Sequence, residues 1–439
     1  MRIGVLLAAA TVLMACGGTS TGGSTGHTTT TGASATGASG AAASSGTAGA
    51  SSGTTASTAS STGASTTSTA GSTTSTNTST SSTGTSATST SNSTSTSTTT
   101  GTTATTTGTS TTGTTGTTGG CGTCPADYTC GTANGIPVCR APSGIPRFSH
   151  VFVIPMENTS WSTLDQSTNT PFIHGLETSA AYATDYHGVA HPSLPNYLAM
   201  ISGGDQGVGC DCQATGNTSC NAFTCNLVLG SCSCGGQSAR TVVDDLEAAG
   251  ENWRAYGENM GTPCNTSDGT GYAVRHVPFL YFAGPTDDSV VPNHCEDHIV
   301  DYSSFAADLA AGPRDFNFLT PNLTDDMHDP SYPSNGPQNL ANGDTWLSQQ
   351  IPAIMASPAY QDGGLIVIVW DEDDDSGGIT GTDDPIGMFI ISPYAKTNFP
   401  SGVTADHYSL LATIEDGLGV GRLGSAGNAT PLTDFFPNQ

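Results

Sequence analysis

The strongest constraint on how this chain can fold is a long tract that lacks apolar side chains. Residues 17–120 are almost wholly Ser, Thr, Gly and Ala, with no Val, Ile, Leu, Met, Phe, Tyr or Trp. Such a composition cannot bury enough apolar surface to offset the conformational entropy that folding removes. We therefore expect a disordered tether over residues 16–120, with an end-to-end distance of roughly 50–60 Å. The folded part should begin near residue 121.

The residues before the tether have the layout of a bacterial secretory signal. Arg2 is followed by an apolar run from Val5 to Met14, which is too short to cross a bilayer. The segment LMAC, which ends at Cys16, resembles the lipobox of bacterial lipoproteins. That resemblance implies a lipoprotein signal peptide over residues 1–15 and a lipid on Cys16. Ordinary signal cleavage near Ala15 is the alternative.

A lipid on Cys16 would place the protein at the bacterial cell envelope. Gly17 is not the aspartate associated with retention in the inner membrane, so the resemblance to bacterial lipoproteins favours the outer membrane. Periplasmic and surface-exposed orientations both stay open. We expect the lipid anchor to be the only contact with the membrane.

The folded part of the chain is strongly acidic. The net charge is −27, the tether carries no charged residue and the signal segment contributes only Arg2, so the negative charge belongs to the residues after the tether. An acidic body repels nucleic acids and anionic lipid surfaces, and we expect neither as a partner. We predict no protein partner either. An anionic substrate would need a local positive centre, which a bound metal ion would supply.

Apart from Cys16, the cysteines fall into clusters with even numbers. One cluster lies in residues 121–141, a second lies in residues 210–234, and Cys264 and Cys295 form a pair. Even numbers predict disulfides made in an oxidising compartment, without fixing which cysteines pair. Zinc is the alternative, because the first cluster contains a C-x-x-C spacing and the second contains C-x-C pairs.

Apolar runs that end in polar residues alternate with helical patterns after residue 146. The runs that predict strands are residues 150–158, 315–321, 365–373 and 385–393. The segments that predict helices are residues 240–250, 303–312, 343–355 and 406–419. The alternation predicts an α/β domain over residues 146–437, with a central, mostly parallel sheet and helices on both faces. We expect a small Cys-rich module at 121–141 before this domain and a Cys-rich insertion at 210–234 within it.

Two of the predicted strands end in side chains that could bind a metal ion. Glu157 and Asn158 follow one strand, and Asp371 and Glu372 follow another. Ligand sites of such sheets lie beyond the carboxyl ends of the strands, so we expect these side chains to meet there. Their oxygens suit a divalent cation, namely Ca²⁺, Mg²⁺ or Mn²⁺, with Zn²⁺ as a further candidate. Solvated strand ends are the alternative for each pair.

The run DEDDDSGG, which begins at Asp371, also imitates a calcium-binding loop. An EF-hand needs Gly at its sixth position and Glu at its twelfth, where this chain has Ser376 and Thr382. We therefore do not expect a calcium-loop module.

A single serine lies between two prolines in the stretch HPSLPNYLAMISG. Pro192 and Pro195 restrict the backbone around Ser193, and the apolar residues that follow have helical spacing. We therefore expect Ser193 at the N-terminus of a helix, where the helix dipole favours an incoming phosphate. A metal ion there would deprotonate the hydroxyl and make it a nucleophile. An ordinary N-cap serine is the alternative.

Several histidines lie in similar polar surroundings: His191, His276, His328 and His407. As cations or hydrogen-bond donors they could hold phosphate oxygens or protonate a leaving alkoxide. Each of them alone is more often a structural histidine. Together they favour a phosphate site.

Eight ordered segments make the chain similar to the bacterial phosphoesterases that include acid phosphatases and phospholipases C, within the alkaline-phosphatase-like superfamily. They span residues 148–427 approximately, and among them are VFVIPMENTSW, HPSLPNYLAMISG, YAVRHVPFLYF and LIVIVWDED. The resemblance implies an alkaline-phosphatase-like three-layer sandwich that uses a divalent metal ion.

The resemblance also implies roles for individual residues. The metal would be held by Glu157, Asn158, Asp371 and Glu372. Ser193 would be the nucleophile that becomes transiently phosphorylated, and His276 and His328 would bind the phosphoryl group. The further candidates for substrate binding are His191, Asn196, Asp326 and His407.

The HPSLPNY form resembles the acid phosphatase branch more than the longer phospholipase C branch. We therefore expect a metal-dependent phosphomonoesterase that acts on a small phosphoester. A phospholipase C-like phosphodiesterase is the alternative among enzymes. A catalytically silent surface protein for binding or adhesion is the alternative outside them, and the intact candidate residues argue against it. We expect no organic cofactor.

Overall fold

The computed structural model describes residues 120–215, 233–289, 291–328, 337–374 and 384–437. The predicted signal peptide, Cys16 and the predicted tether up to residue 119 lie outside the described residues. The same is true of Cys220, Cys225 and Cys232, and of residues 375–378 of the acidic run together with Thr382. Within the described ranges, the helices are too short or too polar to cross a membrane.

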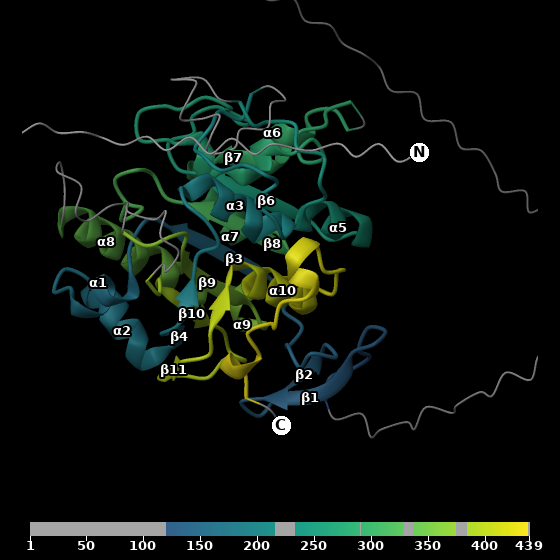
Figure 1. Cartoon of the computed structure of the whole chain (residues 1–439). Helices are drawn as coiled ribbons and strands as arrows, with labels where there is room; N and C mark the ends of the chain where they lie inside the picture. The colour runs from purple at the N-terminus through teal and green to yellow at the C-terminus, as the bar shows by residue number, and fades with distance from the viewer. Residues whose placement is uncertain (1–119, 216–232, 290, 329–336, 375–383, 438–439) are drawn as a thin grey trace, which may run out of the picture. The chain divides into compact units, whose positions relative to one another are not determined.

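An eight-stranded sheet forms the centre of the domain. Its strands are β3 (Val151–Met156), β4 (Ala181–Ala183), β6 (Trp253–Gly257), β7 (Ile299–Asp301), β8 (Phe316–Thr320), β9 (Leu365–Trp370), β10 (Met388–Ile391) and β11 (Phe399–Ser401). Their order is β11-β4-β10-β9-β3-β8-β6-β7, and the labels of Figure 1 follow it from the bottom of the view to the top. From β9 to β7 all neighbours are parallel, whereas β10 is antiparallel to both β9 and β4. The sheet is therefore mostly parallel, as predicted.

Helices occupy the connections between these strands. The α-helices are α1 (Trp161–Gln166), α2 (Pro171–Ser179), α3 (Ser193–Ser202), α5 (Val242–Ala249), α6 (His294–His298), α7 (Phe305–Ala311), α8 (Pro337–Met355), α9 (Pro358–Gln361) and α10 (His407–Leu418). Short 3₁₀ segments are η1 (Val274–His276), η2 (Pro278–Tyr281), η3 (Tyr302–Ser304), η4 (Gly424–Gly427) and η5 (Thr433–Phe435). Every strand and helix predicted above has a counterpart among these elements.

Helices cover both faces of the sheet. Val153 of β3 pairs with Phe318 of β8, so their side chains share a face, and Phe152 lies on the other face. The ring of Phe318 packs against Tyr197 of α3, whereas the ring of Phe152 packs against Phe305 of α7. The helices α3 and α7 therefore lie on opposite faces. The prediction of an α/β three-layer sandwich is confirmed.

The two central strands have the burial that their apolar sequences predict. All residues of β3 and β9 are buried, as expected for apolar runs covered on both faces.

The helix predicted to begin at Gly343 begins instead at Pro337. Gly343 does not start this helix but permits a close contact, because a Cβ there would lie 2.3 Å from the Met327 side chain.

Disulfides join described cysteines of each even-numbered cluster. Two of them, Cys121–Cys130 and Cys124–Cys139, hold the hairpin of β1 (Thr129–Ala133) and β2 (Ile136–Arg140). Two others, Cys212–Cys234 and Cys264–Cys295, lie in the main domain. Disulfides are confirmed, and the zinc alternative is wrong for these cysteines. Arg140 connects the hairpin to the C-terminal segment, because its Nη2 donates to the Pro437 carbonyl (2.7 Å).

Candidate active site

The ends of β3 and β9 bring the four predicted metal ligands together. The Asp371 N–H donates to the Met156 carbonyl (3.0 Å), so the residues that follow these parallel strands lie side by side. Asn158 donates from its backbone N–H to Asp371 Oδ1 (3.0 Å) and from Nδ2 to Glu372 Oε1 (3.1 Å). Glu157 and Asp371 are fully buried, and Glu372 is 4% exposed. The alternative of solvated strand ends is therefore wrong.

Ser193 is the first residue of α3, and its side chain faces this cluster. Its Oγ lies 3.0 Å from Glu157 Oε2 and 3.1 Å from Glu372 Oε1, with Asn158 Oδ1 at 3.5 Å. The N-cap of the helix is Pro192, and the Ser193 hydroxyl does not cap it. The N-cap interpretation of Ser193 is therefore wrong. The Ser193 hydroxyl has one hydrogen and can donate to only one of these three oxygens. The other two oxygens keep lone pairs that Ser193 does not satisfy.

The donor atoms of this cluster fit a divalent cation. They are oxygens from carboxylates, an amide and a hydroxyl, which is the set that hard cations prefer. Asp371 Oδ2 is buried without a hydrogen-bond donor among the described residues, so its lone pairs are available. Burial, and then the charge of neighbouring carboxylates, raises the pKa of Glu157 and of Asp371 well above the usual range. A bound cation would offset this repulsion.

Tyr197 and His276 contact the other oxygen of Glu157. The Tyr197 hydroxyl donates to Glu157 Oε1 (2.5 Å), and His276 Nε2 lies 3.2 Å from the same oxygen. The two rings are stacked, with centroids 5.3 Å apart. Burial, with smaller effects from the charges of Arg275 and His328, lowers the pKa of His276 well below its usual value. His276 is therefore a neutral imidazole that can donate one hydrogen bond.

Asp326 and His328 reach the same edge from the loop after β8. The Glu157 N–H donates to the Asp326 carbonyl (2.8 Å), and the His328 N–H donates to Asp326 Oδ1 (2.9 Å). Asp326 Oδ2 lies 3.9 Å from His276 Nδ1. Burial raises the pKa of Asp326 to about 7. Asp326 therefore holds the backbone of His328 and lies near the ring of His276, the two histidines that the resemblance assigns to the phosphoryl group.

His191 approaches the cluster from the loop before Ser193. Its Nδ1 forms an ion pair with Glu372 Oε2, and its Nε2 lies 3.7 Å from Asp373 Oδ1. The His191 side chain is 20% exposed, in contrast to the buried carboxylates it contacts. It therefore lies between the cluster and solvent.

Asn196 and His407 hold backbone groups of the site. Asn196 Oδ1 accepts from the N–H groups of Val189 and Ala190 (2.8 and 3.1 Å), and its Nδ2 donates to the Ala190 carbonyl (2.6 Å). His407 Nε2 lies 2.7 Å from the Asp371 carbonyl oxygen. Both side chains are fully buried. They position the backbone of the site, and their contact with a substrate stays a prediction.

Two further residues belong to the site and were missed by the sequence patterns: Tyr197 and Arg275. Arg275 Nε lies 3.5 Å from Asp211 Oδ2. Burial alone would lower the pKa of Arg275. The negative charges of Asp211 and then of Glu157 raise this pKa by more, so the net shift is upward. The chain has nine Lys and Arg residues in all. The sequence does contain a signal for Arg275, because it is a cation directly before the candidate His276.

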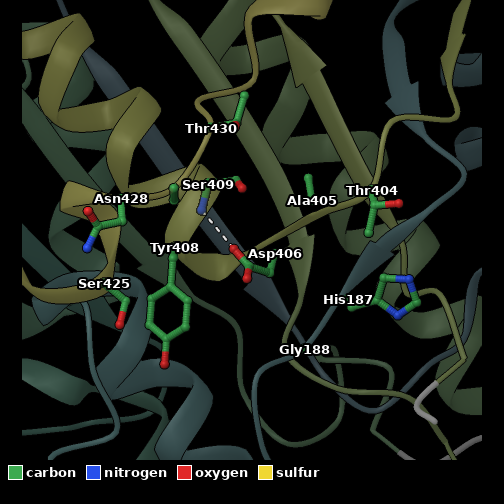
Figure 2. Close-up of a pocket in the computed structure, with 11 residues that line it drawn as sticks. His187, Gly188, Thr404, Ala405, Asp406, Tyr408, Ser409, Ser425, Asn428 and Thr430 are labelled. Atoms are coloured by element: carbon green, nitrogen blue, oxygen red, sulfur yellow. Dashed lines mark hydrogen bonds between the residues drawn. The ribbon is translucent and has the colours of Figure 1, made fainter.

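A pocket of about 470 Å³ adjoins the cluster. It is bordered by the paired strands β5 (Tyr186–His187) and β12 (Ala405–Asp406) and by the start of α10. Figure 2 shows Tyr408, Ser425 and Asn428 on one side and His187 and Thr404 on the other. The lining is thus rich in hydroxyl, amide and imidazole groups.

Gly188 connects this pocket to the cluster. It lines the pocket, and a Cβ at this position would lie 2.9 Å from the Asp371 carbonyl oxygen and 3.3 Å from Asn196 Oδ1. The backbone at residue 188 can approach Asp371 this closely because it carries no side chain.

The phosphoesterase family model matches residues 151–421, a range that contains every residue of the cluster. The chain belongs to the phosphoesterase family. The predicted family is thereby confirmed, and so is the prediction of a hydrolase that acts on phosphoric esters.

Named relatives are phosphatases from bacteria and fungi. The phosphatidylinositol-3-phosphatase of Mycobacterium tuberculosis is 28% identical over 67% of this chain and 85% of that protein. The phosphate-repressible acid phosphatase of Penicillium chrysogenum is 24% identical over 63% of this chain. The match spans 60% of the length of that fungal protein. A solved structure of an alkaline phosphatase superfamily protein from Vibrio parahaemolyticus matches with a TM-score of 0.44 and 13% identity, over 71% of this chain and 74% of that one.

Proposed function

We propose that the protein is a metal-dependent phosphomonoesterase of the acid phosphatase type, with Ser193 as its nucleophile. The observation that carries this proposal is the position of Ser193 Oγ, 3.0 Å from Glu157 Oε2 and 3.1 Å from Glu372 Oε1. Either carboxylate is within reach of the hydroxyl proton. The N-terminal end of α3 also favours the approach of a phosphate to this serine.

The proposed reaction has two displacements at phosphorus. Ser193 Oγ attacks phosphorus as its proton passes to a neighbouring carboxylate, and the bond from phosphorus to the leaving alcohol breaks. The leaving oxygen takes up a proton, and His191 lies on the solvent side of the cluster where it can deliver one. Water then attacks the phosphoserine and gives a proton back to His191, the bond between Oγ and phosphorus breaks as Oγ takes back its proton from the carboxylate, and phosphate leaves. Arg275, a cation whose charge Glu157 supports, and His276, a hydrogen-bond donor, would stabilise charge on the phosphate oxygens.

The metal ion of this proposal would be held by Glu157, Asn158, Asp371 and Glu372. When bound, it would neutralise phosphate charge and lower the pKa of the Ser193 hydroxyl. The all-oxygen donor set favours Mg²⁺, Ca²⁺ or Mn²⁺ over Zn²⁺.

A polar phosphate monoester is the substrate class that we propose. The named relatives are a phosphatidylinositol-3-phosphatase and an acid phosphatase. The pocket beside Gly188 has a polar lining, which suits a leaving group that carries hydroxyls.

The test compares a nitrophenyl phosphate monoester with the matching diester, using the full chain before and after chelation. We expect chelator-sensitive turnover that favours the monoester and returns when a divalent cation is added. Ser193→Ala should abolish turnover while its melting temperature stays near that of the wild type. Ser202→Ala is the matched control, because Ser202 lies at the other end of α3 and its hydroxyl donates to the Leu198 carbonyl.

Each other outcome points to a different function. A preference for the diester would replace the proposal with a phospholipase C-like phosphodiesterase. Turnover that survives Ser193→Ala would remove the serine mechanism. No turnover of either ester with any of the four metals would favour the silent surface-binding protein.

We also propose that Cys16 carries a lipid that anchors the protein to the bacterial outer membrane. The LMAC segment and the long polar tract that follows support this proposal. Palmitate fed to expressing cells should label the wild-type chain but not Cys16→Ser. Unlabelled wild-type protein would argue against the anchor, and protease treatment of intact cells would separate surface exposure from a periplasmic location.

A further inference from the structure

A second group of metal-binding side chains lies outside the active site. Glu247 of α5 and His294 and His298 of α6 each place one ligand atom within 4.8 Å of the others. The two histidines are four residues apart in the segment HCEDH, so they lie on the same side of one helical turn. We propose that these three side chains bind a zinc ion that joins α5 to α6.

His294 contacts a backbone carbonyl through one ring nitrogen and Glu247 through the other. Its Nδ1 lies 3.2 Å from the Pro285 carbonyl oxygen, to which it donates in the tautomer that carries the ring hydrogen on Nδ1. Its Nε2 lies 2.7 Å from Glu247 Oε1. In the tautomer with its hydrogen on Nδ1, the Nε2 lone pair and the Glu247 carboxylate face the same point, which is the arrangement that a shared zinc ion needs. In the other tautomer Nε2–H donates to Glu247 Oε1, and zinc binding would replace that hydrogen bond.

His298 has the same type of outer contact as His294. Its Nδ1 lies 2.8 Å from the His294 carbonyl oxygen, so Nδ1 carries the hydrogen and Nε2 carries the lone pair. Its ring stacks on Trp253, with centroids 4.8 Å apart. The Trp253 Nε1–H donates to Glu247 Oε1 (2.6 Å). Carbonyl groups on Nδ1 and an N–H on the carboxylate are the outer contacts that orient zinc ligands.

Contacts that need no metal hold α6 in place. Cys295, which lies between the two histidines, is joined to Cys264 by a disulfide. Arg254 Nη2 donates to the Asp297 carbonyl (2.7 Å) near the end of the helix. The ligands are therefore positioned before an ion arrives, which lowers the entropy that binding must overcome.

The ligand types select zinc and distinguish this group from the active site. Two imidazoles and one carboxylate are a donor set for zinc, whereas Mg²⁺ and Ca²⁺ prefer oxygen ligands. The group also lies at the opposite end of the sheet. Trp253 begins β6 and pairs with Phe316, the first residue of β8, whereas the active site follows the last residues of its strands. A strand of this length spans about 16 Å, so the zinc would serve stability and not the chemistry at Ser193.

The test counts zinc on the full chain by mass spectrometry of the metal after equilibrium dialysis. The variants are His298→Gln and Glu247→Gln, and the control is His174→Gln. His174 also pairs with a carboxylate, with Nδ1 2.8 Å from Glu177 Oε1, but it belongs to no such three-ligand group among the described residues. We expect the wild type and His174→Gln to hold one zinc per chain more than His298→Gln and Glu247→Gln. Added zinc should raise the melting temperature of the wild type more than that of His298→Gln.

Activity and folding are followed in the same samples. Turnover of the nitrophenyl monoester with its preferred cation should be equal in the wild type and His298→Gln, which separates this site from the proposed active site. If chelated His298→Gln melts well below the chelated wild type, the substitution itself disturbs the fold. The zinc count of Glu247→Gln then decides whether these side chains bind zinc. Equal zinc counts in the wild type and the folded variants would overturn the proposal. They would leave only the hydrogen bond between His294 and Glu247.

Discussion

Ser193 and Tyr197 contact the two oxygens of one carboxylate from successive turns of α3. Ser193 Oγ lies 3.0 Å from Glu157 Oε2, and the Tyr197 hydroxyl donates to Glu157 Oε1 (2.5 Å). Residues four apart share a face of a helix, so α3 itself sets the position of Glu157 relative to Ser193. Tyr197 is therefore a positioning residue for the proposed nucleophile and metal site.

The first prediction concerns Tyr197→Phe. The change removes the hydroxyl that holds Glu157 and keeps the ring that stacks on His276. Loss of such an outer contact costs about 10–100-fold in metal affinity or activity. We expect the activity to saturate at a higher divalent cation concentration, which a metal titration of turnover would measure. The control is Tyr256→Phe, whose hydroxyl donates to Asp308 (2.9 Å) away from the site. Equal metal titrations for Tyr197→Phe and the wild type would show that Tyr197 does not position the cluster.

The second prediction concerns Gly188→Ala. The new Cβ would lie 2.9 Å from the Asp371 carbonyl oxygen, so the backbone must shift beside a proposed metal ligand. Such overpacking costs about 1–3 kcal/mol, and we expect a lower melting temperature together with reduced turnover. Gly175→Ala is the matched control, because a Cβ there meets nothing within 4 Å on helix α2. Alanine is favoured over glycine inside a helix by about 1 kcal/mol, so this control should be at least as stable as the wild type. A fully active Gly188→Ala would mean that Asp371 tolerates the shift.

The sequence was sufficient for the parts of the site that follow from local patterns. The apolar runs of β3 and β9 end in polar residues, and parallel pairing of the two strands brings Glu157 and Asp371 together. Pro192 and Pro195 mark the start of α3 at Ser193. The strand ends and the helix start depend on residues that are neighbours in sequence, and local chemistry predicts them. The meeting of Glu157 and Asp371 follows from the general rule that parallel strands end at one edge of a sheet.

The remaining features depend on contacts between distant segments. Tyr197 has the spacing of a core residue of α3, and only the approach of Glu157 gives its hydroxyl a partner. The resemblance makes Asn196 and His407 candidates for substrate binding. In the structure, the backbone of residues 189–190 and of Asp371 occupies their polar atoms. The antiparallel direction of β10 also depends on the pairing with β9 and β4, which a pattern of strands and helices does not specify.

A buried carboxyl outside the active site makes stability depend on pH. Glu415 of α10 is fully buried, and its Oε1 accepts from the Leu423 N–H (2.9 Å). Its Oε2 lacks a hydrogen-bond partner among the described residues. Burial raises the pKa of Glu415 to about 8, and the attraction of Arg422 offsets only part of that effect. Glu415 is therefore protonated in the folded protein at neutral pH and ionised in the unfolded chain.

The third prediction follows from the sign of this difference. Between about pH 4.5 and pH 8 the folded state holds one proton more than the unfolded state at this site, so the free energy of unfolding falls as pH rises. Glu415→Gln keeps the acceptor for Leu423 and removes the titration. We expect the variant and the wild type to have similar melting temperatures at pH 4, and the variant to gain on the wild type with increasing pH, by ~3–5 kcal/mol above pH 8. Melting curves across this range would test it, with Glu251→Gln as a half-exposed control that should follow the wild type. A constant difference between Glu415→Gln and the wild type at every pH would contradict a raised pKa at Glu415.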